Sequence, residues 1–222
     1  MSQGLATLLI SGTLETLYMV ILSSLIAFII GLPLGVVLSV TAQGGILQNK
    51  PVNAALSLVV NVGRSVPFVI LMIAIIPFTR KIVGTSIGTN AAVVPLSVAA
   101  IPFVGRVVES ALREIDQGIV EAAQSMGATP MEIVCKVLLP EGLPAIIAGL
   151  TLTLINLIGY SAMAGTIGGG GLGDVAIRYG YQRFMLDVMI ATVAVLVILV
   201  QLCQLIGDKL AAVTRHDRKN EG

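Results

Sequence analysis

Long stretches without charged residues constrain this chain more than any other feature of its sequence. They cover residues 16–49, 51–79, 82–105, 142–173 and 188–207, and only Arg64 interrupts the second. At 1.5 Å per residue, about 20 residues cross a hydrocarbon core about 30 Å thick, so each stretch is long enough to span a membrane. Backbone groups in lipid must be hydrogen-bonded internally, and the stretches show no period of two, so they predict helices.

The composition supports a membrane protein. Only 11% of the 222 residues are charged and 56% are apolar, whereas a water-soluble domain has about 25% charged residues. We therefore expect an all-α integral membrane protein with five transmembrane helices. We take 1–222 as one domain with a core of about 13–207 and a charged tail at 208–222. The net charge of +1 argues against a nucleic-acid partner, and Cys135 and Cys203 lack the spacing of a metal site.

The distribution of Lys and Arg predicts the orientation. With five crossings, one side collects nine of these residues and the other side collects four. Since positive charges accumulate in cytoplasmic segments, the C-terminus is expected in the cytoplasm and the N-terminus outside. Arg64 is expected near the cytoplasmic end of its helix, where it can reach the interface, and a role in a transport pathway is the alternative. Gly31 and Gly35 form a GxxxG pair, which predicts close helix packing.

The segment 106–141 differs from the rest, because it holds nine charges in 36 residues. We predict two short helices within it. Asp116 is the expected N-cap of the first helix, which runs towards Met126 and ends at Gly127.

The second short helix has a strong start signal. Thr129 and Glu132 form a capping box, and Pro130 takes the first helical position, where its missing N–H costs nothing. We expect this helix to end at Pro140. The two helices and the glycine between them would form an elbow with a small Ala-Ala surface, a shape that fits helix-in-groove recognition.

The spacing within this elbow resembles a known motif. Glu121-Ala122-Ala123, three residues, Gly127, nine residues and then Val137-Leu138-Leu139-Pro140 are similar to the EAA loop of binding-protein-dependent ABC importers. The family pattern is EAA-x3-G-x9-I-x-L-P, and the one departure is Val137 in place of isoleucine, which keeps the shape and the apolar character. The resemblance covers 20 residues at fixed spacing and assigns ATPase coupling to Glu121, Ala122, Ala123, Gly127, Ala128, Thr129, Pro130, Leu139 and Pro140.

Further segments resemble the methionine permeases within this family. They are 64–68, 76–80, 83–88, 126–131 and 159–163. The resemblance implies the type I ABC importer fold, with the cytoplasmic EAA loop between the third and fourth transmembrane helices. It also implies a bacterial inner-membrane protein that translocates methionine by alternating access.

The resemblance implies partners as well: a second copy of this chain, two ABC ATPase subunits and an extracytoplasmic substrate-binding protein. ATP and Mg would be bound by the ATPase, so no cofactor is expected on this chain. The sequence itself agrees, because no glycine precedes a lysine and the P-loop G-x4-G-K-[ST] is therefore missing. Residues 168–173 satisfy G-x-G-x-x-G, but a membrane-length stretch precedes them, so we expect a flexible or tightly bent external connector rather than a nucleotide site.

Polar and small residues form a stripe on the fourth stretch. The stripe has five positions: Gly149, Thr153, Asn156, Tyr160 and Met163. At 100° per residue along a helix, they fall within an arc of about 80°. We interpret Thr153, Asn156, Tyr160 and Met163 as a translocation pathway, and hydrogen bonding between helices is the alternative.

Two other functions stay open on the sequence. The first is an ABC importer permease for another small amino acid or a peptide, since the stripe itself names no substrate. The second is an ion-driven secondary transporter, which is disfavoured because no Asp or Glu lies within the five stretches. A membrane enzyme is disfavoured because the stretches contain no acid/base pair and no metal cluster.

Overall fold

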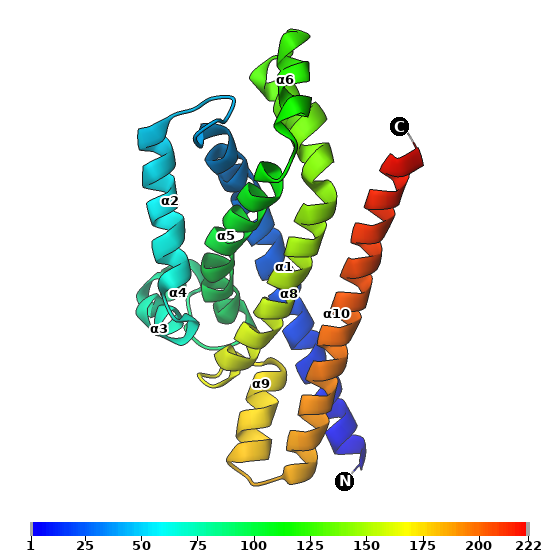
Figure 1. Ribbon diagram of the computed structural model, residues 1–222. Helices are drawn as coiled ribbons and strands as arrows, with labels where there is room; N and C mark the ends of the chain where they lie inside the picture. The colour runs from blue at the N-terminus through cyan, green and yellow to red at the C-terminus, as the bar shows by residue number, and fades with distance from the viewer. Residues whose placement is uncertain (1, 221–222) are drawn as a thin grey trace. The chain divides into compact units, whose positions relative to one another are not determined.

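The computed structural model describes residues 2–220 of the chain and the side chains of residues 4–214. The described residues contain helices and their connections, and no strand (Figure 1). In chain order, the elements are α1 (Ser2–Thr41), α2 (Lys50–Ser65), α3 (Phe68–Ala74), α4 (Ile76–Val83), α5 (Thr89–Arg113), α6 (Gln117–Ser125), α7 (Pro130–Glu132), the π-helix η1 (Ile133–Leu138), α8 (Leu139–Gly165), α9 (Gly171–Val175), the π-helix η2 (Ala176–Tyr181) and α10 (Leu186–Asn220).

The chain divides into two compact units, each built from separated segments. Unit 1 contains Met1–Ala27, Val66–Ala100 and Thr153–Gln204. Unit 2 contains Phe28–Ser65, Ile101–Leu152 and Leu205–Gly222. The long helices α1, α5, α8 and α10 each contribute residues to both units. The single domain expected over 1–222 stays a prediction.

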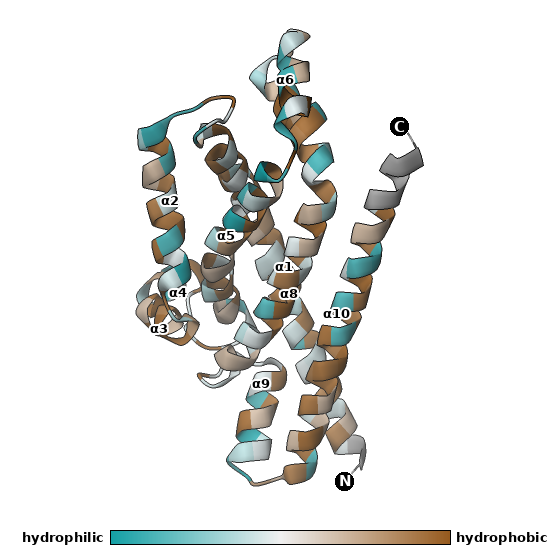
Figure 2. Ribbon diagram, in the orientation of Figure 1, coloured by the Kyte–Doolittle hydropathy of each residue, from teal (hydrophilic) through white to brown (hydrophobic). Residues whose placement is uncertain are grey.

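Four helices are long and apolar enough to cross a membrane. They are Gly4–Thr41, Thr89–Arg113, Pro130–Gly165 and Leu186–Thr214. Apolar residues dominate the long helices α1 and α10, whereas α6 is largely polar (Figure 2). A fifth span is available only if α2 and α3, which are bent by 100° at their junction, count as one crossing.

The second stretch, 51–79, is therefore not one continuous helix, as its length suggested. The helix ends at Ser65, and α3 starts after Pro67. Proline lacks an N–H and disfavours helical dihedral angles at the preceding residue, here Val66, which explains the break. The third span also begins later than expected, at Thr89 instead of residue 82, because Gly84 ends α4 in the left-handed conformation.

The expected helix end at Pro140 is wrong. Helix continues from Pro130 to Gly165, with Pro140 in the first turn of α8. The π-helix η1 precedes it, and Leu139 N–H there donates to Val134 O, five residues back. In this wider turn, the proline ring avoids the clash with the carbonyl four residues back that normally ends a helix.

Within unit 2, the two glycines of the GxxxG pair lie directly against α5. A Cβ atom at Gly31 would stand 2.7 Å from Val104 Cβ, and one at Gly35 would stand 2.5 Å from Gly105 O. Such distances are shorter than real contacts, so α1 and α5 approach this closely only because both positions are glycine. The predicted packing role is confirmed.

Within unit 1, the glycine-rich connector is tightly bent, as expected, and α1 holds it. Glu15 Oε2 accepts a hydrogen bond from Gly171 N–H at 2.6 Å, and Thr16 Oγ1 accepts one from Leu172 N–H at 2.9 Å. Gly171 has φ +75°, and a side chain there would collide with Thr16 and Met19. These contacts hold the connector against α1.

Candidate coupling elbow and membrane-embedded residues

The first half of the elbow forms as its sequence predicts. Asp116 Oδ1 accepts a hydrogen bond from Gly118 N–H at 2.8 Å and so caps α6. The helix ends at Ser125, and Gly127 takes φ +83°. Its N–H donates to Gln124 O at 2.9 Å. This left-handed residue reverses the chain, and a glycine adopts it without steric cost.

The second half is fixed by the predicted capping box. Thr129 N–H donates to Glu132 Oε2 at 3.0 Å, and Glu132 N–H donates to Thr129 Oγ1 at 3.4 Å. Lys136 Nζ lies 3.0 Å from the other oxygen of Glu132. Pro130 occupies the first helical turn. These reciprocal contacts give the helix a defined start two residues after Gly127.

The residues of the EAA motif divide between surface and interior. Glu121 and Ala122 are exposed, whereas Ala123 is buried. Ala128 N–H donates to Ala123 O at 3.1 Å across the elbow. Ala123 therefore closes the elbow, while Glu121 and Ala122 remain accessible to a partner.

The end of the motif lies where the elbow joins α8. Leu139 is half-buried and Pro140 is exposed at the start of that helix. The coupling role of the motif residues stays a prediction at this stage.

Sequence reasoning missed two exposed methionines beside Gly127. Met126 is 82% exposed and Met131 is 71% exposed, one on each side of the turn. Methionine is flexible and polarisable, and such side chains are common on surfaces that bind helices of other proteins. The signal was present in the sequence as apolar residues next to a helix-ending glycine and a capping box.

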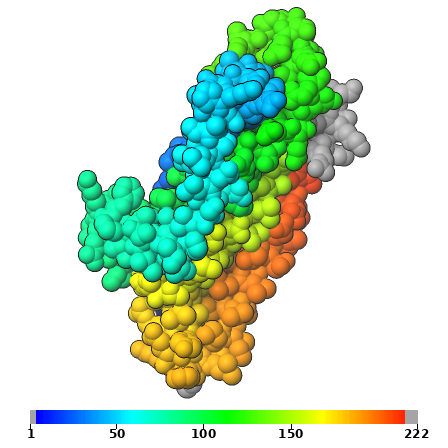
Figure 3. Space-filling view, turned by 60° about the vertical axis from the view of Figure 1, so that its left-hand side comes forward, coloured from blue at the N-terminus to red at the C-terminus, as the bar shows by residue number. Residues whose placement is uncertain are grey.

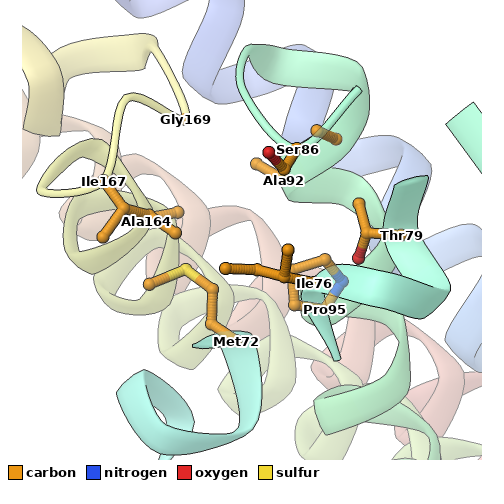
Figure 4. A pocket seen from close by; sticks show the side chains of 10 residues that line it. Met72, Ile76, Thr79, Ser86, Ala92, Pro95, Ala164, Ile167 and Gly169 are labelled. Atoms are coloured by element: carbon orange, nitrogen blue, oxygen red, sulfur yellow. The ribbon is translucent and has the colours of Figure 1, made fainter. Parts of the chain in front are cut away.

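Beside the elbow in unit 2, a cleft of about 300 Å³ opens between Asp116, Ile119 and Glu141 and reaches the lower end of the ordinary range for ligand pockets. Two other hollows are smaller. A cleft of about 160 Å³ lies in unit 2 between the 42–46 connector and the residues Arg113, Gln117 and Val120. In unit 1, a cavity of about 10 Å³ opens between Met72, Ile76, Ala164 and their neighbours, which is room for about one water (Figure 4). Both volumes are below the roughly 300–1,000 Å³ of ordinary ligand pockets.

The polar stripe on α8 is not uniformly accessible. Gly149 is buried against Val107 in unit 2, and Thr153 is buried. Asn156 is exposed, and Met163 is 43% exposed.

Tyr160 has a partner that the sequence did not reveal. Its ring stacks on that of Phe68 in α3, with centroids 4.6 Å apart and planes 3° from parallel. Within unit 1, the stack joins α3 to α8. The assignment of the four residues to a translocation pathway stays a prediction.

A buried ionic cluster lies in unit 2 near the end of α5. The Glu109 side chain is 3% exposed and forms two ion pairs. Its Oε2 lies 2.6 Å from Arg106 Nη1, and its Oε1 lies 3.5 Å from Arg113 Nη1. Arg106 also donates to Asn61 Oδ1 of α2 at 2.6 Å. The five uncharged stretches contain no acidic residue, but α5 extends beyond the stretch 82–105 to Arg113. It therefore includes one buried carboxylate, that of Glu109. Among the residues described, no group of His, Cys, Asp and Glu could hold a metal ion.

Comparison with known proteins identifies the family. Residues 31–216 match the family described as binding-protein-dependent transport system inner membrane component. The chain belongs to this family. The match includes the whole coupling elbow and the broken α2–α3 segment, so this permease carries both features inside the region that defines the family.

Individual relatives cover nearly the whole permease. It is 58% identical over 209 residues to a probable D-methionine transport system permease of Vibrio cholerae, covering 94% of this chain and 93% of that protein. It is 48% identical over 203 residues to a methionine import system permease of Bacillus subtilis, covering 91% of each chain. Similarity of this extent makes the chain a relative of methionine permeases.

Solved structures agree with the fold. A chain of the inward-facing MetNI methionine ABC transporter superposes with a TM-score of 0.95 at 51% identity, covering 96% of this chain and 99% of that chain. An amino acid ABC transporter gives a TM-score of 0.76 at 22% identity, which supports the fold alone. The protein therefore has the fold of a type I ABC importer permease.

Proposed function

We propose that this chain is the membrane-spanning permease of an ATP-driven importer that translocates methionine into the cytoplasm. The similarity to two methionine permeases, each over more than nine-tenths of the chain, supports this substrate.

The proposed assembly has two copies of the permease, two ABC ATPase subunits and an extracytoplasmic substrate-binding protein, all held in membrane lipid. The permease itself is not an enzyme, because its sequence has no P-loop to bind nucleotide phosphates. ATP and Mg bind to the ATPase subunits.

The observation that carries the proposal is the elbow between α6 and η1. Capped helices fix its shape, and Ala122, Met126 and Met131 give it a small apolar surface. Such a surface fits a groove on the ATPase. When ATP draws the ATPase subunits together, the elbows move with them, and the membrane helices switch between inward-open and outward-open states.

The proposed location is the bacterial inner membrane, which the family description names. The N-terminus lies outside and the C-terminus lies in the cytoplasm. Leaving out Arg64 at the far end of α2, eight of the thirteen Lys and Arg residues fall on the side that this orientation places in the cytoplasm and four on the other side, which supports it. The same orientation puts the elbow where an ATPase can reach it.

Gly127→Pro tests the coupling. Proline cannot adopt φ +83° and has no N–H to donate to Gln124. We expect the variant complex, reconstituted in vesicles, to lose ATP-driven methionine uptake while the protein stays in the membrane. The control is Gly127→Asn, because asparagine tolerates the left-handed conformation and should retain most of the uptake. Wild-type uptake by Gly127→Pro would overturn the mechanism.

Two further measurements separate the alternatives. If the substrate is another small amino acid or a peptide, the partner binding protein will bind that compound rather than methionine in a calorimetric titration. If an ion gradient drives transport, a protonophore will stop uptake and vanadate will not. We expect the opposite result, because an ABC ATPase is inhibited by vanadate.

A further inference from the structure

Helix α2 presents two different faces to its surroundings. Leu58, Val59 and Val62 are 64%, 67% and 56% exposed, and these positions cover an arc of about 100°. The polar positions of α2 form a second arc, which covers about 120° at 100° per residue. They are Asn53, Ser57, Asn61, Arg64 and Ser65. Figure 3 shows α2 (cyan) at the surface of the chain. In a membrane, the first arc suits lipid. In the second arc, Asn53 donates to Leu38 O of α1 and Asn61 accepts from Arg106 of α5, so Arg64 and Ser65 form its open end.

Arg64 lies on this polar face in the last turn of α2, 14 residues from Lys50, which is a rise of about 21 Å along the helix against a hydrocarbon core of about 30 Å. In the orientation proposed above, the cytoplasmic end of α2 is Lys50, so Arg64 lies at the opposite end of this helix, well inside the membrane. Its guanidinium carbon lies 5.7 Å from the ring centroid of Phe103 in α5.

Among the described side chains, Arg64 has the Phe103 ring as a partner and forms no ion pair. Glu109 is already shared by Arg106 and Arg113. Among the residues whose side chains are described, no carboxylate lies within ion-pair distance of Arg64. A guanidinium facing lipid at this depth costs at least about 2.5–3.5 kcal/mol, so an unpaired arginine here belongs in contact with water or with an anionic ligand.

We propose that the open end of this polar face, at Arg64 and Ser65, lines the aqueous pathway and that Arg64 binds the carboxylate of the amino acid in transit. The inference rests on the proposed function, since it assigns a role to the substrate of that importer. A guanidinium stays charged and matches a carboxylate with two parallel hydrogen bonds. The carbonyl end of α2 follows directly, at Ser65, and its partial negative charge suits the ammonium group of the same substrate.

Thiol accessibility tests the first half of the proposal. In a complex with Cys135 and Cys203 replaced by serine, Arg64→Cys should react with a charged, membrane-impermeant methanethiosulfonate reagent. The matched control Val59→Cys, on the apolar arc of the same helix, should stay unlabelled. If Arg64→Cys is inert, or if both positions react equally, the polar face does not line an aqueous pathway and the proposal fails.

Charge rescue tests the second half. Arg64→Gln should lower methionine uptake about tenfold or more, the usual effect of losing one charge-assisted hydrogen-bonded pair. Arg64→Lys should keep part of the uptake. Aminoethyl methanethiosulfonate adds a cation to Arg64→Cys and should restore uptake, whereas the sulfonatoethyl reagent adds an anion and should not.

The controls separate this inference from the proposed function. If the unmodified complex imports no methionine, the proposed function itself fails. If it imports methionine and the Arg64 variants do so equally well, only the carboxylate site fails. Loss of the complex from size-exclusion chromatography in Arg64→Gln would place the residue in an interface between subunits and would also overturn the site.

Discussion

Replacing Gly35 with alanine tests whether backbone contact between α1 and α5 sets the spacing of unit 2. The new Cβ would stand 2.5 Å from Gly105 O and from Val108 Cβ, whereas ordinary contacts begin at 3.4 Å. The helices must therefore separate locally by about 0.9 Å, since a helical carbonyl cannot rotate away. Overpacking of this kind costs about 1–3 kcal/mol.

Alanine also favours helix over glycine by about 0.5–1 kcal/mol, which offsets part of that cost. We expect a net loss of about 1–2 kcal/mol in the free energy of unfolding, or a melting temperature about 2–8 °C lower for a chain of this size. The assay is the fraction of monodisperse complex that survives stepwise heating in detergent, followed by size-exclusion chromatography.

The matched control is Gly159→Ala in α8, where an added Cβ meets no atom within 4 Å. It gains the helix preference without the collision, so it should melt at or slightly above the temperature of the unmodified complex. If the Gly35→Ala and Gly159→Ala complexes have the same melting temperature, close approach of the backbones does not set the spacing of α1 and α5, and the reasoning is refuted.

Two other predictions concern acidic side chains. Glu109→Gln removes the one carboxylate shared by Arg106 and Arg113. Glutamine keeps an acceptor oxygen and both arginines are partly exposed, so we expect a loss of about 1–3 kcal/mol and a lower melting temperature in the same heating assay. An unchanged melting temperature would contradict a stabilising role of the ion pairs. Glu15→Ala removes the acceptor of Gly171 N–H, at a cost of about 1–3 kcal/mol. Hydrogen exchange of the 168–173 connector, followed by mass spectrometry, should then speed up about tenfold, while Glu15→Gln, which keeps an acceptor oxygen, should exchange at nearly the original rate.

The elbow could be predicted from sequence because its signals are local. Asp116, Gly127 and the Thr129–Glu132 box each act on backbone groups within four residues, and each has the expected contact or conformation. Short-range hydrogen bonds and one left-handed residue determine such a structure almost independently of the rest of the chain.

The breaks in the membrane helices were harder to predict, because hydropathy does not report backbone geometry. Pro67 follows the end of a helix, whereas the helix continues through Pro140. The difference is the π-helix before Pro140, which widens the preceding turn. Its formation depends on tertiary packing and has no short sequence signal.

The contacts of the charged side chains could not be predicted, because they depend on pairing between distant segments. Arg106 reaches Asn61 across 45 positions of sequence, and Glu109 is buried only because the neighbouring elements cover it. Counting charges along the chain correctly indicated a membrane protein. It could not indicate which of them lie in the interior.

The two hydrogen bonds between α1 and the glycine-rich connector affect how far this permease can be shortened at its N-terminus. The family match begins at residue 31, yet Glu15 and Thr16 supply the acceptors for Gly171 and Leu172. Four consecutive glycines, residues 168–171, have no side chains with which to replace those contacts. A chain trimmed to the matched region would keep its elbow and lose the support of its connector. The segment that matches the family is thus shorter than the segment that holds the connector in place.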